Sequence, residues 1–310
     1  NDLKKAEYEL KDAVSLNPEH SLAHAMLGSV YLETGRLKEA VDEYINAIKL
    51  DPSASITYYK LGFAYEALGY IDKAIEIYKK AIGLDPDFME TYYSLGNVYI
   101  KKNLADEAVK YFEVAYSKNN RSVEACYGLG MCYAKLNQSD SALEYFNKAI
   151  KIDPNHVDSY YQIGIIFKQK NEYELATKNI EEAIKLNPEN SAYYYDLGLI
   201  LQVQGNAELA IKAFKTACSL NPQNSLYRHN LGLALFEQKK YGEAALEFKK
   251  AVRLSPYNAD IHFNFAQVLE KANEFKEAAN SYENFLKFCP DYENKQEIEY
   301  KIEYIREQAK

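Results

Sequence analysis

Every proline in this chain falls on one 34-residue spacing. One position of the series, Asn120, lacks a proline. Scattered prolines would not share one phase, so the spacing reflects a structural repeat. Each proline follows an apolar stretch such as Ala47–Leu50, where its ring clashes with the preceding turn and ends a helix. The chain must therefore fold as a series of 34-residue units, each closed by a residue of the proline series: Pro18, Pro52, Pro86, Pro154, Pro188, Pro222, Pro256 and Pro290.

Residues 55–88 show the internal logic of one unit. Apolar residues at i, i+3, i+4 and i+7, counted from Tyr58, form one face of an amphipathic helix. Gly69 follows this helix, and glycine readily adopts the left-handed conformation that ends helices. A second apolar face then runs from Ile71 to Ile82 before the proline. The sequence therefore predicts a helical hairpin for each unit.

The units resemble the tetratricopeptide repeat, whose pattern is aromatic-x2-Leu-Gly-x2-Tyr, then Ala-x3-aromatic, then Pro. A glycine recurs in the first helix of seven units, with Ala266 in the eighth, and an alanine recurs in every second helix. The resemblance covers essentially the whole chain and implies an all-α fold, a right-handed α-solenoid or superhelix of stacked hairpins. One copy of the pattern reads Tyr92, Leu95, Gly96, Tyr99, Ala108 and Phe112.

The resemblance implies one solenoid domain over residues 1–310. Residues 1–20 match only a second helix, so we expect a truncated repeat there and interpret the start of the chain as a cut end. Residues 21–292 hold eight complete repeats. Residues 293–310 place an apolar isoleucine face among charged residues, which is typical of the capping helix that a solenoid needs for solubility. We interpret that end as a genuine one.

Asn120 marks an unusual junction between two repeats. Lys118 replaces the usual apolar residue before it, and Asn120 replaces the proline. Asparagine tolerates turn geometry well, so an ordinary junction is one interpretation. A flexible joint that divides the repeats into two stacks is the other.

Composition excludes several function classes. The net charge of −8 argues against nucleic acid as a partner, because such binding requires a basic surface. No apolar run has the roughly 20 residues that span a bilayer, so we expect no direct membrane insertion. The four cysteines have no metal-ligand spacing and are expected as buried apolar residues. Free cysteines favour a reducing compartment, and the expected location is cytoplasmic.

The resemblance also implies where a partner binds, since first helices line the concave face of such arrays. One position of these helices carries a tyrosine in five successive repeats and His229 in the next. Tyrosine suits recognition because it joins a large apolar body to a polar tip. It equally suits packing against the next repeat, and both alternatives stay open. Apolar residues one turn later lead us to expect a more apolar groove toward the C-terminal half. The predicted peptide-binding residues are Tyr59, Tyr93, Asn97, Lys101, Tyr127, Met131, Lys135, Tyr161, Ile165, Lys168, Tyr195, Leu199 and His229.

Lysines end the first helices of three successive units, as Lys101, Lys135 and Lys168. Cations at this end complement the helix macrodipole. Alternatively, they form a basic edge for acidic side chains or a terminal carboxylate of a bound peptide. The carboxylate clamp of some family members needs a lysine and an asparagine one turn apart on a first helix. Tyr93 precedes Asn97 here, so that clamp is not supported.

No sequence motif of an enzyme, a phosphate loop or a dinucleotide site occurs. His20 and His24 are four residues apart but flank a helix start, so we expect no shared metal and no cofactor. We therefore predict a non-enzymatic scaffold that binds a peptide segment or helix of a partner protein in the concave groove. One alternative is a substrate-recruiting or regulatory module of a larger enzyme whose catalytic domain lies outside this sequence. Another possibility is self-association through the exposed N-terminal helix.

Overall fold

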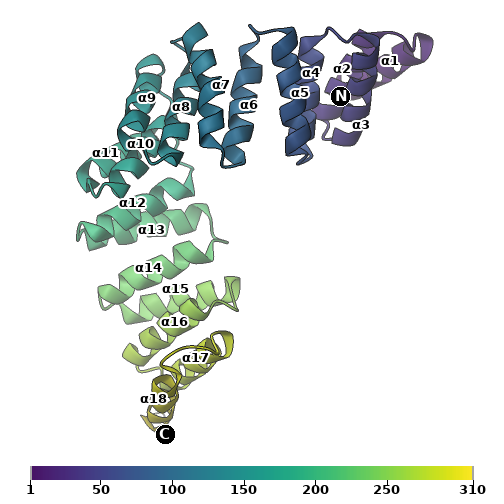
Figure 1. Cartoon of the computed structure of the whole chain (residues 1–310). Helices are drawn as coiled ribbons and strands as arrows, with labels where there is room; N and C mark the ends of the chain where they lie inside the picture. The colour runs from purple at the N-terminus through teal and green to yellow at the C-terminus, as the bar shows by residue number, and fades with distance from the viewer. Residues whose placement is uncertain (1, 309–310) are drawn as a thin grey trace. The chain divides into compact units, whose positions relative to one another are not determined.

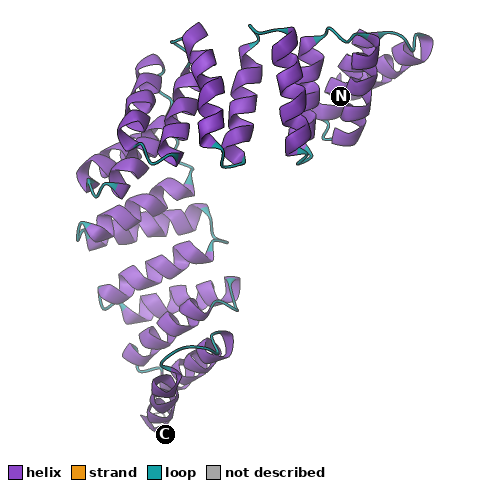
Figure 2. Cartoon of the chain, viewed as in Figure 1, coloured by secondary structure: helices purple, strands orange, loops and turns teal. Residues whose placement is uncertain are grey.

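The computed structural model describes residues 2–308, and this part of the chain is helical without any strand (Figures 1 and 2). The prediction of an all-α fold is confirmed. The helices are α1 (Asp2–Leu16), α2 (Ser21–Glu33), α3 (Leu37–Leu50), α4 (Ser55–Ala67), α5 (Ile71–Leu84), α6 (Met89–Lys101), α7 (Ala105–Lys118), α8 (Val123–Lys135), α9 (Ser139–Ile152), α10 (Val157–Gln169), α11 (Tyr173–Leu186), α12 (Ser191–Val203), α13 (Ala207–Leu220), α14 (Ser225–Glu237), α15 (Tyr241–Leu254), α16 (Ala259–Lys271), α17 (Phe275–Phe288) and α18 (Lys295–Gln308).

Each complete repeat pairs a first helix with a second helix that is one residue longer. In the repeat of α4 and α5, the lengths are 13 and 14 residues. The two helices lie side by side, as they also do for α12 and α13 (Figure 1). None of the helices in residues 2–308 combines the length and apolar character that crossing a bilayer requires.

The turn inside every hairpin needs one residue with positive φ. Gly69 occupies this place in its repeat at φ 80°, which confirms the sequence prediction. Lys239 holds the same place at φ 60°, a conformation that is costly for a side chain with a Cβ atom. Glycine or asparagine fills the place in the other repeats because these residues tolerate left-handed backbone best. They are Gly35, Asn103, Asn137, Asn171, Gly205 and Asn273.

The core of a hairpin is a large side chain of the second helix pressed against a glycine of the first. Phe112 is 1% exposed, and a Cβ atom on Gly96 would lie 2.5 Å from its ring. The same contact joins Gly62 to Tyr78 and Gly232 to Phe248. The alanine one turn before the large residue is fully buried in every complete repeat. Small residues at these places let the two helix backbones approach closely.

The junction at Asn120 has the same backbone as the proline-bearing junctions. Asn119 has φ −141° and ψ 93°, and Asp51 has φ −131° and ψ 90°. In both, the side-chain oxygen accepts a 3.0 Å hydrogen bond from the amide two residues on. Ser122 then caps α8 by accepting from Ala125 N at 3.0 Å. The Asx side chain therefore shapes this turn, with or without proline.

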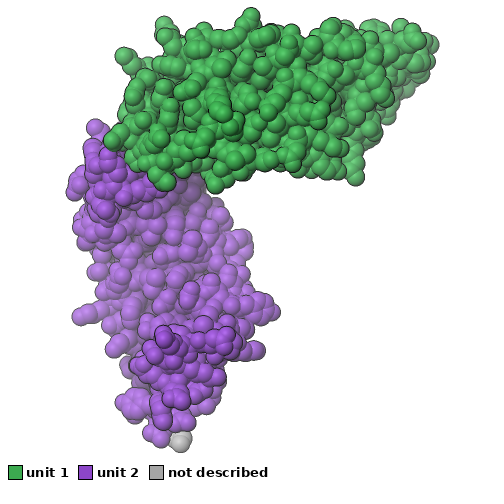
Figure 3. All heavy atoms as spheres, viewed as in Figure 1, with its two compact units in different colours: residues 1–159 green, residues 160–310 purple. Residues whose placement is uncertain are grey.

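The chain forms two compact units, residues up to 159 and residues from 160 onward (Figure 3). The boundary falls within α10 and not at Asn120. In the second unit, α18 packs on α17 and buries the predicted isoleucine face of Ile298, Ile302 and Ile305. Whether residues 1–310 act as one solenoid domain stays a prediction.

Candidate functional site: the first-helix surface

The predicted peptide-binding residues all lie on first helices, and we use the name first-helix surface for the exposed and half-buried side chains of all first helices, these residues included. Seven of the predicted residues belong to the first unit, on α4, α6 and α8, and six to the second unit, on α10, α12 and α14. In the first unit, α6 packs beside both α4 and α8, so its residues lie on adjacent helices.

In the first unit, the tyrosine that recurs on the first helices is half-buried against the last residue of its own repeat, directly before the next first helix begins. The ring of Tyr59 lies edge-on to Phe88, with the centroids 5.0 Å apart. The hydroxyl of Tyr93 donates to Ser122 Oγ at 2.8 Å. Tyr127 likewise lies edge-on to His156 at 5.0 Å. These rings therefore pack at the junction where one repeat meets the next.

In the second unit, the same position bonds to the next first helix at a fixed spacing of 35 residues. Tyr161 donates its hydroxyl to Asp196 Oδ2 at 2.7 Å. Asn230 Nδ2 donates to the hydroxyl of Tyr195 at 3.2 Å. His229 continues the series by accepting from Asn264 Nδ2 at 2.9 Å. Of the two interpretations of the tyrosines, packing against the next repeat is observed, and recognition of a partner stays a prediction.

The three lysines differ in their surroundings. Lys101 Nζ forms an ion pair with Glu66 at 2.5 Å. Lys168 Nζ lies 2.6 Å from Asp196 Oδ1, which places it in the same network as Tyr161. Burial raises the pKa of the Tyr161 phenol, so the hydroxyl stays protonated and donates. Lys135 is exposed and has no ion pair within residues 2–308. Of the three lysines, Lys135 is therefore the one whose charge is available to a partner without breaking an ion pair in the described residues.

The exposed apolar side chains do not follow the expected trend toward the C-terminal half. Met131, Ile165 and Leu199 are half-buried. Phe63, by contrast, is 46% exposed on α4. Three more exposed apolar residues on α2 and α4 were not predicted as site residues. They are Leu22, Met26 and Ile56.

Position within the repeat could have revealed two of these missed residues. Leu22 and Ile56 occupy the second residue of their repeats, where the next three repeats carry Glu90, Glu124 and Asp158. An apolar residue at a place that is acidic in the next three repeats is a usable signal, and Leu226 holds the same place in the second unit. It indicates that the first two repeats present a different chemistry from the three that follow them.

The histidines show no arrangement for a shared metal. His24 is buried, with Nδ1 2.5 Å from Glu43 and Nε2 3.1 Å from the carbonyl oxygen of Pro18. Within residues 2–308, no three His, Cys, Asp or Glu side chains gather as a metal site requires. Burial also raises the pKa of the Cys132 thiol to about 12, which makes it a poor nucleophile.

His229 predicts a pH dependence in the second unit. Burial lowers its pKa below the usual 6.5, against a smaller opposing effect of Asp260. The unfolded chain then binds the proton more readily. The stability associated with neutral His229 is thus complete above pH 6.5 and is lost as the pH falls through the lowered folded value. We expect His229→Tyr, which copies Tyr195 of the preceding repeat, to weaken the fall in urea midpoint between about pH 7.5 and 5. An unchanged pH profile in this variant would contradict the assignment.

The repeated hairpins on a 34-residue period define a helical-hairpin repeat protein. Models described as "TPR repeat" match residues 28–69, 67–103 and 232–273, and models described as "Tetratricopeptide repeat" match 90–117, 123–156 and 161–225. The chain belongs to the tetratricopeptide repeat family. Repeats of this family are generally non-catalytic interaction modules, and they support a role as a protein–protein interaction scaffold.

Solved structures agree with this fold. The structure of YrrB, described as "a TPR protein with an unusual peptide-binding site", is 26% identical with a TM-score of 0.51, and the match covers 63% of this chain and 97% of YrrB. Pseudomonas aeruginosa PilF is 19% identical with a TM-score of 0.59, over 69% of this chain and 97% of PilF. A chain of the Cut9–Hcn1 hetero-tetramer is 19% identical with a TM-score of 0.56, over 97% of this chain and 59% of that one. Among curated proteins, no match was found.

Proposed function

We propose that this protein is a scaffold that binds an extended or helical segment of another protein on its first-helix surface. The observation that carries the proposal is a set of exposed apolar side chains on α2 and α4, two first helices that pack against each other. Its members are between 46% and 60% exposed, although both helices also supply buried core residues. Apolar side chains gathered on one face are typical of interaction sites. They are Leu22, Met26, Ile56 and Phe63.

Polar residues farther along the first unit supply the specificity in this proposal. Asn97 on α6 is exposed and can both donate and accept hydrogen bonds. Lys135 on α8 offers a cation without an internal partner in the described residues. Lys101 contributes after exchanging its ion pair with Glu66. A bound segment would anchor apolar side chains on α2 and α4 and polar or acidic ones on α6 and α8.

The second unit carries a different first-helix surface. Ile165 and Leu199 are half-buried there, and Val203 and Leu226 are 63% and 50% exposed. We propose this surface as a second place for a partner segment. The peptide-binding site of YrrB supports the proposal, because this chain is similar to that structure. A recruiting or regulatory module of a larger enzyme would use the same surfaces.

The test must avoid residues that also hold repeats together. Alanine at Tyr127 or Tyr161 would remove packing as well as any contact with a partner. Phe63 is a better target, because it is 46% exposed, and Leu84 on the second helix α5 is a matched control at 44%. Peptides selected from a displayed random library on the intact protein provide the ligands.

We expect Phe63→Ser to weaken binding of the selected peptides about tenfold, the effect of losing one interface anchor. Leu84→Ser should leave binding unchanged. Circular dichroism of both variants checks that the fold is intact, and titration calorimetry measures the affinities. Equal affinity for the Phe63→Ser variant, or a library that yields no binders, would refute the proposed surface.

A further inference from the structure

The repeats provide an internal standard, and the junction between α7 and α8 departs from it at several places. Arg121 follows the proline position, where the other repeats carry only neutral or acidic residues. Tyr116 replaces an aliphatic residue or cysteine, and Lys118 replaces an apolar residue. Since the backbone at this junction equals that at Asp51, turn geometry does not require these changes. The residues at the corresponding place in the other repeats are Glu19, Ser53, Asp87, Asn155, Glu189, Gln223, Tyr257 and Asp291.

A cavity of about 300 Å³ lies at this junction, between the end of α7, the connecting loop and the end of α9. Its lining contains three cationic side chains and no acidic one. None of the lining residues belongs to a first helix, so the cavity is separate from the first-helix surface. The lining residues are Tyr116, Asn120, Arg121, Lys148, Lys151 and Ile152.

Of the three cationic side chains that line the cavity, one forms an ion pair with a neighbouring side chain and two do not. Lys148 pairs with Glu144 at 2.7 Å and lies over the Tyr116 ring, 5.4 Å from its centroid. Within residues 2–308, Arg121 and Lys151 form no ion pair, and both are exposed. The preceding junction is neutralised, because Lys118 pairs with Asp87. Asp87 and Lys118 are 31 residues apart. At the next junction the corresponding pair is Arg121 and Ile152, and Ile152 carries no charge.

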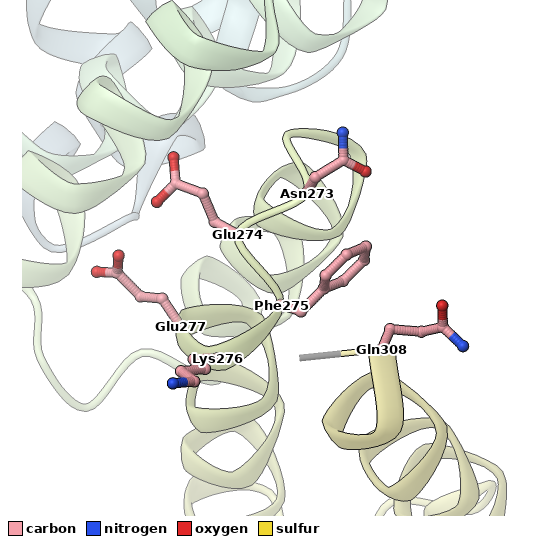
Figure 4. A pocket seen from close by; sticks show the side chains of 6 residues that line it. All are labelled: Asn273, Glu274, Phe275, Lys276, Glu277 and Gln308. Carbon is pink, nitrogen blue, oxygen red and sulfur yellow. The ribbon is translucent and has the colours of Figure 1, made fainter. Parts of the chain in front are cut away.

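A larger cavity, at the turn between α16 and α17, is lined by side chains of both charge signs. That cavity, of about 480 Å³, is lined by Glu274, Glu277 and Lys276 among others. In Figure 4, Phe275 lies on the side of the turn where Gln308 ends α18, and both glutamates point to the opposite side. Its mixed charges select no ligand class.

We propose that the cavity at the α7–α8 junction binds a phosphate group. A guanidinium binds two phosphate oxygens at once, and lysines add point charges, so this set suits a doubly charged oxyanion better than a single carboxylate. The phosphate is carried by a phosphorylated side chain of a partner protein or by a small free molecule. Asn120 adds an amide where proline would offer no donor.

The test titrates the intact protein with inorganic phosphate at constant ionic strength, with chloride as the compensating anion, and follows amide NMR signals. We expect saturable shifts at residues 116–122 and 148–152. Arg121→Gln should weaken the affinity about tenfold, as expected when a charged hydrogen-bonding group is lost. Lys151→Gln should weaken it as well. Arg253→Gln is the matched control, because Arg253 holds the place of Lys151 in another repeat, and it should have no effect.

A second arm compares a peptide that carries one phosphoserine with its unphosphorylated form. Tighter binding of the phosphopeptide than of inorganic phosphate identifies a protein-borne group, and equal binding identifies a free phosphate; either result supports the site. Absence of saturation with both probes, or equal affinity in the Arg121→Gln variant, overturns the proposal. The Phe63→Ser variant should bind phosphate normally, which separates this test from that of the first-helix surface.

Discussion

One methyl group added at Gly128 is expected to lower the free energy of unfolding by about 2–3 kcal/mol, the upper range for overpacking a core. A Cβ atom there would lie 2.2 to 2.6 Å from three atoms of the Phe112 ring. The ring cannot move away, because Gly96 on its own repeat already touches its other side at a distance that admits no Cβ atom. Gly128→Ala must therefore separate two repeats or displace a buried ring. Urea unfolding followed by circular dichroism measures the loss.

Gly83 supplies the matched control for this substitution. It lies in helix α5, and a Cβ atom there would meet no atom within 4 Å. Gly83→Ala should raise the free energy of unfolding by about 0.5 kcal/mol, because alanine is the better helix former. Combining Gly128→Ala with Phe112→Leu should cost less than the sum of the two single changes, since a smaller side chain relieves the clash. A neutral Gly128→Ala variant would disprove the account of this packing.

Asp196→Ala is expected to cost about 2–3 kcal/mol, because a carboxylate that holds two donors is removed. Its side chain is only 13% exposed and its partner Lys168 is 30% exposed, so water compensates little for the lost ion pair. The change also removes the acceptor for the hydroxyl of Tyr161. The same urea titration, read at the midpoint, reports the effect.

Asparagine at position 196 separates charge from hydrogen bonding. Asn230 and Asn264 occupy this place in the next two repeats, so Asp196→Asn fits the local backbone. We expect it to cost about 1 kcal/mol, through the lost ion pair with Lys168 alone. If alanine and asparagine proved equally destabilising, the bond from Tyr161 would contribute nothing. If neither destabilised the protein, the network would have no structural role.

The sequence predicted the hairpins, their turns and the isoleucine face of α18. The residues that start and end a helix are local signals, and the same signals recur in each repeat. Gly69 shows this: its residue type alone predicted the left-handed turn that is found. Lys239 shows the limit, since nothing local distinguishes a lysine that must adopt the same conformation. There the geometry is imposed by the packing of the two helices.

The candidate site was only partly predictable. Placement of the residues on first helices follows from the period, but their exposure depends on how each repeat rests on the next. Tyr161 was predicted to contact a partner, and the structure shows its hydroxyl bonded to Asp196. Gly128 lies outside the recurring glycine series, and only its approach to Phe112 across a repeat boundary reveals its importance. Contacts across repeats depend on the rotation between them, and a one-dimensional pattern does not contain it.

The shared backbone of the junctions changes what the proline series contributes. Since Asn119 makes the same turn without a proline, the other prolines are not needed to shape the folded chain. They act by reducing the conformational freedom that the unfolded chain has to lose, an effect of about 0.4–1 kcal/mol per residue. A repeat array can therefore give up one proline at a small entropic cost and keep its form. Asn120 is such a place: the proline is lost at a small cost in stability, and the same junction carries the cationic side chain of Arg121.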